Sequence, residues 1–413
     1  MLAPFDPDQL DAAHLVQSDL AGRRILIVTA PFGAFGRTLA RALEARGAEV
    51  RRMIFNAGDL TYWRRPGGVR FNADARSWPL RLGEMARDYT DILVFGEGGA
   101  YNQGVLSQAS RLPAKVWVLE NGYFRPDWIT LERNGVNASS ALPRSAEGYE
   151  PPIPELPVTR PVGKMLPHHV INITLYHLIQ ALGSPVFPRY TLPYTVSPWR
   201  QCLGHVRRYV RLVLQPKSET DVELISQRGP FFIACLQREG DVQLLRYSAF
   251  ADNMAFLAKV MNSFARHAPP EARLVVKNHP LDPGLVDLAH LTRVLAIERG
   301  IADRVDFVDG GNLAQMCRAS LGMVVNNSSA ALSALGFSTP VKVLGRAFFD
   351  FEGLTDQQPL DGFWNQPKPA DKALFARFRA HVIRRSQING NYHEPRAMKH
   401  TAAAVAAAIA RRP

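Results

Sequence analysis

A repeated order of apolar strand, polar loop and amphipathic helix is the feature that most constrains how this chain can fold. Apolar runs at 25–29, 92–95 and 274–276 each end in a loop rich in glycine or polar residues, and a helical pattern follows each loop. Strands that alternate with helices are typical of parallel sheets, whose strand ends meet at one edge. We therefore expect an α/β protein whose functional residues lie at the carboxyl ends of its strands.

The chain contains two such series, which are separated by 137–198, where prolines and loop residues dominate. At 413 residues the chain is also long for a single hydrophobic core. We place the connection between two domains in that segment. Two Rossmann-like domains that face each other across a cleft form the GT-B layout, which is the fold class predicted here.

The composition indicates a folded protein that favours anionic partners. Apolar residues make up 46% and charged residues 21%, and 49 Lys and Arg exceed 37 Asp and Glu, which gives a net charge of +12. The sequence contains no RNA-recognition signature, zinc finger or aromatic-rich basic tract, so we expect no nucleic-acid partner. The widely spaced Cys202, Cys235 and Cys317 offer neither a disulfide framework nor a CxxC metal site.

Membrane insertion and secretion are not predicted. No segment approaches the ~20 apolar residues of a membrane-spanning helix. Residues 1–15 are acidic and interrupted by prolines, unlike a secretory signal. We expect a cytoplasmic protein, and we expect its positive charge to bind it to an anionic membrane surface.

Four loops stand out because each follows a predicted strand and carries polar residues. Hydroxyl and amide side chains between a strand and a helix can cap that helix, and the same geometry presents backbone N–H groups to a phosphate. Plain capping and turn formation therefore remain open for each loop. The loops are Glu120-Asn121-Gly122, Gln237 to Asp241, His279-Pro280, and Asn326-Asn327-Ser328-Ser329.

Several stretches together resemble the capsule polysaccharide biosynthesis family almost from end to end. They are PFGAFGRTLARALEARG, ENGYFRPDWITLERNGVN, LQREGD, KNHPLDPG, NNSSAALSALGFSTPVKVLG and QINGNY. Characterised members of that family are Kdo transferases that build a β-linked Kdo linker on a lipid, typically phosphatidylglycerol. The chain resembles in particular the single-module members that place the first Kdo.

The resemblance implies a domain order and a donor. It implies an acceptor-side Rossmann-like domain over 1–195, a CMP-sugar-binding domain over 196–365, and C-terminal helices over 366–413 that pack back across the domains. The donor would be CMP-Kdo, with no required cofactor and no metal. The partners would be a lipid acceptor and other capsule assembly proteins, on the inner face of the inner membrane.

The resemblance extends to bacterial sialyltransferases of GT-B type, in which HP and Ser/Thr-Ser motifs bind the CMP part of the donor. The implied donor-binding residues are Gln237, Lys277, His279, Pro280, Asn327, Ser328 and Ser329. Residues implied on the acceptor side or at the sugar carboxylate are Arg125, Asn121, Glu97, Phe35 and Arg37, and Lys342 is another candidate for the sugar carboxylate. His168 and His169 lack a third ligand at useful spacing, which favours a structural or acceptor-side role.

The catalytic residues implied are Asp241 and Glu120. The acidic motif of the sialyltransferases has Asn121 at its second position here, which removes their carboxylate base and leaves Glu120 to activate the acceptor. Asp241 would attack the sugar and form a covalent Kdo adduct, so that configuration is retained. Glu239 is the nearest competitor for the nucleophile, and a surface role for Asp241 stays open, as does a structural pairing of Glu120 with Arg125.

Two other classes of function remain open from the sequence. One is a GT-B-like enzyme that uses a UDP-sugar, either an epimerase or an inverting transferase. The other is a basic, non-catalytic adaptor of a capsule assembly complex. The departure at Asn121 favours an adaptor, whereas Asp241, His279 and Ser328 favour an enzyme.

Overall fold

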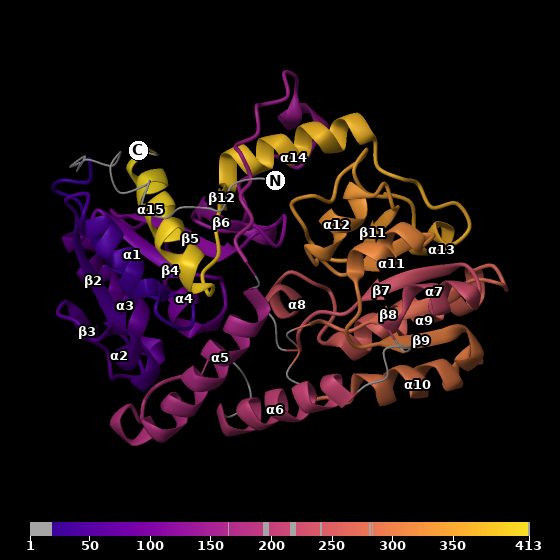
Figure 1. Ribbon diagram of the computed structural model, residues 1–413, viewed down its shortest axis with the longest axis horizontal. Helices are drawn as coiled ribbons and strands as arrows, with labels where there is room; N and C mark the ends of the chain where they lie inside the picture. Colours follow the sequence, from indigo (N-terminus) through magenta and orange to yellow (C-terminus); the bar gives the residue numbers. More distant parts are fainter. Residues whose placement is uncertain are drawn as a thin grey trace.

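The computed structural model describes residues 19–163, 165–192, 198–214, 220–239, 242–280, 282 and 284–411. Two sheets with helices on both faces form two lobes (Figure 1). This arrangement confirms the predicted α/β fold with two Rossmann-like domains in the GT-B manner. Within the described residues every helix is too short or too polar to cross a bilayer.

The first sheet has seven strands in the order β12-β6-β5-β4-β1-β2-β3, and all are parallel except β6, which runs antiparallel to both neighbours. The strands are β1 (Arg24–Ile27), β2 (Glu49–Ile54), β3 (Gly68–Arg70), β4 (Asp91–Phe95), β5 (Lys115–Asn121), β6 (Trp128–Arg133) and β12 (Gln387–Asn389). The helices that connect them are α1 (Phe35–Glu44), α2 (Ala57–Trp63), α3 (Trp78–Met85) and α4 (Gly99–Leu106).

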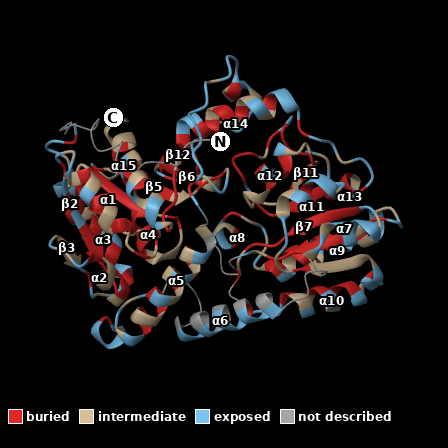
Figure 2. Cartoon of the chain, viewed as in Figure 1, coloured by how far each residue is buried: buried red, intermediate tan, exposed pale blue. Residues whose placement is uncertain are grey.

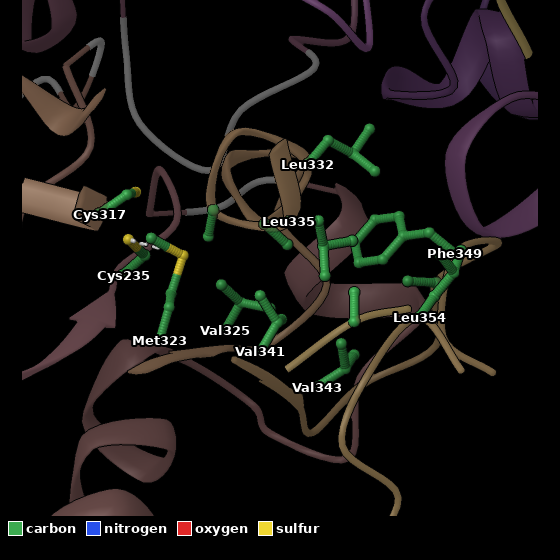
Figure 3. Packing of buried hydrophobic residues seen from close by; sticks show 14 of the residues in the cluster. Cys235, Cys317, Met323, Val325, Leu332, Leu335, Val341, Val343, Phe349 and Leu354 are labelled. Carbon is green, nitrogen blue, oxygen red and sulfur yellow. Dashed lines mark hydrogen bonds between the residues drawn. The ribbon is translucent and has the colours of Figure 1, made fainter. Parts of the chain in front are cut away.

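The second sheet has five parallel strands in the order β11-β10-β7-β8-β9. The strands are β7 (Phe231–Cys235), β8 (Arg273–Lys277), β9 (Val305–Val308), β10 (Gly322–Val325) and β11 (Val341–Val343). The helices of this domain are α7 (Val222–Gln227), α8 (Val242–Arg246), α9 (Asn253–His267), α10 (Leu288–Glu298), α11 (Leu313–Ala319), α12 (Ala330–Gly336) and α13 (Leu360–Phe363). Continuous apolar runs suit these strands because helices cover both faces of the sheet. Figure 3 shows part of the resulting core, where the buried Cys235 and Met323 lie side by side.

The strand order reverses once in each sheet, and this positions the site. In the first sheet β1 lies between β4 and β2, and in the second β7 lies between β10 and β8. The connections leave in opposite directions at these points, so the loops at the carboxyl ends of the strands separate and open a crevice. Both crevices are therefore places where an open α/β sheet binds its ligand.

The C-terminal segment returns to the first domain. Helix α14 (Lys372–Ser386) follows the second domain, β12 then pairs antiparallel with β6, and α15 (Pro395–Arg411) packs along α1 (Figure 1). Tyr392 from this segment is fully buried and donates its hydroxyl to the carbonyl of Glu120 at 2.9 Å. The end of the chain thus supports a strand end of the first domain.

The proline-rich connection, residues 137–198, is not a loop throughout. Helix α5 (Met165–Leu182) lies within it, and α6 (Pro198–Leu214) follows and packs beside α5. The prolines concentrate outside α5, and Pro167 lies in its first turn, where a missing N–H breaks no helical hydrogen bond. Composition averaged over the whole segment conceals this helix.

An aromatic cluster joins the two domains. Tyr149, from the segment after β6, stacks on Phe351 at 5.8 Å between ring centroids and meets the edge of Phe378 at 5.0 Å. Tyr123 packs on Phe348 in the same cluster, at 4.6 Å. Because these rings come from the first domain, the second domain and α14, the cluster fixes how the lobes meet.

Replacement of Phe378 by alanine should lower the free energy of unfolding by about 3–5 kcal/mol, because it leaves a cavity among packed rings. Phe378 is 0% exposed, whereas Phe375 on the same helix is half-buried. Urea unfolding followed by tryptophan fluorescence measures the loss. Phe375→Ala serves as the control and should cost clearly less; equal losses would contradict the assigned packing.

Candidate functional site

A cavity of about 350 Å³ lies at the strand reversal of the first sheet. Strand ends β1, β4 and β5 supply one wall, α5 supplies another, and two residues come from the second domain. The residues that carry polar groups into it include Thr29, Asn56, Asp59, Glu97, Glu120, Tyr176, His177, Gln180 and Arg238. Since both domains line it, the cavity opens onto the cleft between them.

A compact hydrogen-bond network holds the strand ends of the cavity. The hydroxyl of Thr29 donates to Asn102 Oδ1 at 2.7 Å and accepts from the amide of Phe95 at 2.9 Å. Asn102 donates in turn to the carbonyl of Phe95 at 2.7 Å. The loop after β4 is therefore tied to β1 rather than left to the solvent.

Glu120 enters the cavity at the end of β5. Its Oε1 accepts from the amide of Asn121 at 2.8 Å. Gly96 faces it with a φ of +72°, and a Cβ on Gly96 would lie 3.1 Å from Glu120 Oε2. A side chain at position 96 would be strained and would crowd the carboxylate, so glycine is what the site requires there.

Glu97 is another carboxylate of the cavity, besides Asp59 and Glu120, and is 2% exposed. Burial raises its pKa, and hydrogen bonds from the Val136 amide (3.1 Å), Gln243 (3.0 Å) and the hydroxyls of Ser139 and Tyr247 oppose the rise. A carboxylate with a raised pKa in a cleft is a candidate for acid–base work. Because Gln243 and Tyr247 belong to the second domain, Glu97 also links the domains.

The amides after β7 and β10 bind one another at the strand reversal of the second sheet. Gln237 Nε2 donates to Asn327 Oδ1 at 2.6 Å, and Asn326 Nδ2 donates to Gln237 Oε1 at 2.8 Å. Asn327 donates onward to the carbonyls of Gln243 and Tyr247. The structure therefore gives Gln237 and Asn327 a bracing role, and donor binding by them stays a prediction.

Ser328 and Ser329 precede α12 and are half-buried. The Ser328 hydroxyl accepts from the amide of Ala330 at 3.3 Å, whereas Ser329 occupies the N-cap position without a capping bond from its side chain. Ser328 therefore caps the first turn of α12, and both serines follow β10, the strand next to β7. Their predicted contact with a phosphate is compatible with that geometry.

The loop after β8 is surrounded by positive charge. Burial lowers the pKa of Lys277, whose Nζ lies 3.4 Å from the carbonyl of Asn278. Burial also lowers the pKa of His279 to about 3, and the charges of Arg125, Arg238, Arg208 and Lys277 act in the same direction. His279 is therefore uncharged at neutral pH, so the arginines and Lys277, rather than the imidazole, supply the charge that would attract an anion.

Arg208 on α6 clamps this loop, although no motif distinguishes it from the other arginines of the chain. Its Nη2 donates to the carbonyl of His279 at 3.0 Å and to Asp309 Oδ1 at 2.6 Å, and its Nη1 donates to the carbonyl of Pro280 at 2.8 Å. The side chain is 4% exposed. The neighbouring Arg207 is exposed, so only one of these two consecutive arginines faces the protein.

The remaining predicted site residues lie in three kinds of place: the hydrophobic core, an exposed loop, and the part of the chain that the structure does not describe. Phe35 is 0% exposed and packs edge-on against Tyr392 at 4.8 Å, so it belongs to the core, and Arg37 does not line the cavity. Arg125 is exposed and donates to the Gly122 carbonyl at 3.2 Å. The predicted nucleophile Asp241 lies outside the described residues.

Glu239 and His169 each have a defined partner in the structure, and the role of Glu239 as a nucleophile stays a prediction. Glu239 accepts from Asn253 Nδ2 at 2.7 Å, and burial raises its pKa. His169 is buried and its Nδ1 lies 2.7 Å from His393 Nε2, a pairing that supports a structural role. In the part of the chain that is described, no group of three or more His, Cys, Asp and Glu side chains could hold a metal ion. Lys342 donates to the carbonyl of Asp356 at 3.0 Å.

The family described as "Capsule polysaccharide biosynthesis protein" matches residues 90–393, which is most of the chain. The chain belongs to this family. The match spans both domains and includes the loops that carry Glu97, Glu120, His279 and Ser328, whereas Thr29, Asn56 and Asp59 of the cavity precede it.

Curated members of the capsule family are similar over nearly their full length. The capsule polysaccharide modification protein LipB of Neisseria meningitidis serogroup B is 33% identical over 390 residues, which are 90% of this chain and 92% of LipB. The capsule polysaccharide export protein KpsS of Escherichia coli is 32% identical over 384 residues, 91% of this chain and 98% of KpsS. These relatives confirm the resemblance to the family noted from the sequence.

Solved structures are similar at lower identity. The β-Kdo 2,7 transferase part of KpsC from Thermosulfurimonas dismutans matches with 14% identity and a TM-score of 0.41, over 86% of this chain and 89% of that one. MnaA of S. aureus, solved with UDP, matches with 11% identity and a TM-score of 0.33, over 92% and 94% of the two chains.

Stability should fall as the pH is lowered below about 6.5, because buried histidines resist protonation. The folded pKa of His177 is lowered to about 4 by burial, below its ordinary value of 6.5. The unfolded chain takes up this proton first, so the contribution of His177 is present above pH ~6.5 and is lost as the pH falls towards 4, at about 1.4 kcal/mol per pH unit.

Melting temperatures measured between pH 7 and pH 5 test this expectation. His177→Gln should flatten the pH dependence, whereas His290→Gln, which replaces an exposed histidine, should leave it as in the parent. If melting temperature changes with pH in the same way for the parent and both variants, the pKa of His177 is not lowered in the folded protein.

Proposed function

We propose that the protein is a glycosyltransferase that moves Kdo from CMP-Kdo to a lipid acceptor during capsule synthesis. One observation carries the proposal: Arg208 and Lys277 contact the loop of His279, and the charges of Arg125 and Arg238 act on the same histidine, beside a cavity that Asp59, Glu97 and Glu120 line. A CMP-activated acidic sugar brings two anions, the phosphate and the sugar carboxylate, to the same place. The acceptor hydroxyl needs a base on the other side.

The donor would bind along the carboxyl edge of the second sheet. Lys277 and Arg238 are placed to meet the phosphate, and Ser328 and Ser329 precede a helix whose N-terminus favours an anion. Neutral His279 would donate a hydrogen bond to a phosphate oxygen, and a bound phosphate would raise its pKa. Arg125 comes from the first domain, so it suits the sugar carboxylate at the meeting of the domains.

The acceptor would enter the cavity of the first domain. Glu120 accepts the proton of the attacking hydroxyl, a role that requires a carboxylate within hydrogen-bond reach. Glu97 lies in the same cavity, and its raised pKa makes it the alternative base. The aromatic walls, which include Phe32, Tyr176 and Tyr190, suit the apolar part of a glycerol-based lipid near its head group.

The proposed chemistry proceeds in two displacements. The carboxylate of Asp241 attacks the anomeric carbon as CMP departs with the bonding electrons, which yields a Kdo ester of the enzyme. The acceptor oxygen then attacks the same carbon, Glu120 takes its proton, and the Asp241 carboxylate is released. Two inversions retain the configuration of the donor. Glu239 is the alternative nucleophile.

The proposed location is the cytoplasmic face of the inner membrane, as a peripheral protein alongside other capsule assembly proteins. The net charge of +12 and the membership of a capsule family support it. A UDP-sugar enzyme and a non-catalytic adaptor are the alternatives, and nucleotide binding and turnover distinguish them from the proposal.

Removal of one cation from the His279 loop should weaken CMP binding about 10- to 100-fold, since a charge-assisted hydrogen bond contributes about 1.5–3 kcal/mol. Arg238→Gln tests this by calorimetric titration with CMP and UDP. Arg293→Gln, an exposed arginine of α10 in the same domain, is the matched control and should bind CMP like the parent. Preference for UDP over CMP would contradict the proposed donor.

Replacement of Glu120 by glutamine should lower turnover about 100- to 10,000-fold, the range for a general base, with CMP affinity unchanged. The covalent adduct should then accumulate, because its breakdown needs the base, and intact-mass spectrometry after incubation with CMP-Kdo detects it. Glu84→Gln, at an exposed position of α3, controls for the loss of charge. Full activity of Glu120→Gln would transfer the role to Glu97, and an adduct that persists in Asp241→Asn would exclude Asp241.

A further inference from the structure

The segment that joins the domains has an unusual charge pattern. Between Glu155 and Glu219 the sequence contains no aspartate or glutamate, although the whole chain holds 37. Helices α5 and α6 lie within this segment, and α6 runs along the rim of the molecule beneath both lobes (Figure 1). Every charged side chain of α6 is an arginine.

Helix α6 has one face against the protein and one face away from it. Arg208 is buried in the His279 loop and marks the inner face. At about 100° per residue, the exposed apolar side chains lie about 120° to 180° around the helix from Arg208. They are Trp199 (54% exposed), Leu203 (69%), Val206 (50%), Val210 (54%) and Leu214 (77%).

Helix α5 is divided in the same way. Tyr176, His177 and Gln180 line the cavity. The exposed apolar residues lie on the opposite side of the helix, about 150° to 170° from the mean direction of these three residues, and so face away from the protein core. They are Ile171 (56% exposed), Leu175 (45%) and Leu182 (66%). Figure 2 shows exposed residues along both helices.

Exposed arginines flank the apolar stripe of α6. Arg200, Arg207 and Arg211 lie along one edge of the stripe, about 60° to 100° from its centre. An apolar stripe bordered by cations is typical of a helix that lies in the interface of an anionic bilayer, with its apolar side chains among the acyl chains and its cations at phosphates. The absence of acidic residues removes the repulsion that would oppose such contact.

We propose that the outer faces of α5 and α6, here named the α5–α6 face, dock the protein on an anionic lipid bilayer. The inner faces of the same helices carry cavity residues and the Arg208 clamp, so docking brings the cavity to the lipid head groups. The α5–α6 face deepens the proposed function and rests on it for the lipid acceptor, but vesicle binding can be measured without turnover.

Flotation with vesicles tests the apolar part of the face. The full-length protein should bind vesicles of phosphatidylglycerol and phosphatidylethanolamine. Leu203→Glu should weaken binding at least about tenfold, because it removes an apolar side chain that the bilayer would bury and adds a negative charge. Leu80→Glu is the matched control, since Leu80 is 73% exposed on α3, and it should bind like the parent.

A second pair of variants tests the charged part. Arg207→Gln with Arg211→Gln should weaken binding to anionic vesicles by about thirtyfold, at about 1 kcal/mol for each basic residue. The weak binding to vesicles of phosphatidylcholine alone should change little. Arg41→Gln with Arg87→Gln removes the same charge from two other exposed positions and should have no comparable effect.

The outcomes separate docking from catalysis. Equal vesicle binding by Leu203→Glu, Leu80→Glu and the parent, or no binding by the parent, would overturn the α5–α6 face even if transfer to a lipid is observed. Loss of self-association in Leu203→Glu, seen by light scattering, with unchanged vesicle binding would make the face a contact between copies. Vesicle binding that depends on Leu203 without any Kdo transfer would retain the face and reject the proposed function. Val210→Glu replaces Leu203→Glu if the latter melts early.

Discussion

The candidate site depends on one buried guanidinium. Arg208 donates to the carbonyls of His279, Pro280 and Asp282 and to both oxygens of Asp309, so α6, the loop after β8 and the end of β9 form one unit. A buried arginine left without these acceptors would cost several kcal/mol, so the loop has little freedom to move away. The backbone of His279 is thereby fixed before any ligand binds, which lowers the entropic cost of binding.

The clamp concentrates positive charge on one side of the cleft and leaves the carboxylates on the other. Burial lowers the pKa of His279, and the nearby cations act in the same direction, while burial raises the pKa of Glu97. The two shifts have opposite signs because burial favours the neutral form of each group, which is deprotonated for histidine and protonated for glutamate. A site divided in this way can stabilise a departing anion at one end and accept a proton at the other. Arg125 connects the two sides, since it follows β5, the strand that carries Glu120.

The parts of this site that the sequence predicts are those encoded locally. A strand followed by His279-Pro280 or by Ser328-Ser329 is visible within ten residues, and parallel sheet topology then brings the loops to one edge. The bracing of Gln237 and Asn327, the core position of Phe35 and the clamp of Arg208 depend on contacts between distant segments. The cavity walls from α5 could not be predicted either, because prolines on both sides of the helix conceal its period. Local sequence patterns therefore predict which edge of the sheet carries the site, whereas tertiary packing determines which side chains face that edge.

The separation of positive and negative charge in the cleft explains why α5 and α6 carry no acidic residue. A carboxylate on the inner faces would compete with Asp309 for Arg208 or add negative charge beside Glu97, and both would weaken the charge separation of the cleft. A carboxylate on the outer faces would be repelled by an anionic surface. Both faces therefore disfavour acid, although for different reasons. A pair of helices whose inner side holds the site and whose outer side is apolar and basic couples the position of the catalytic cleft to the surface on which its acceptor lies.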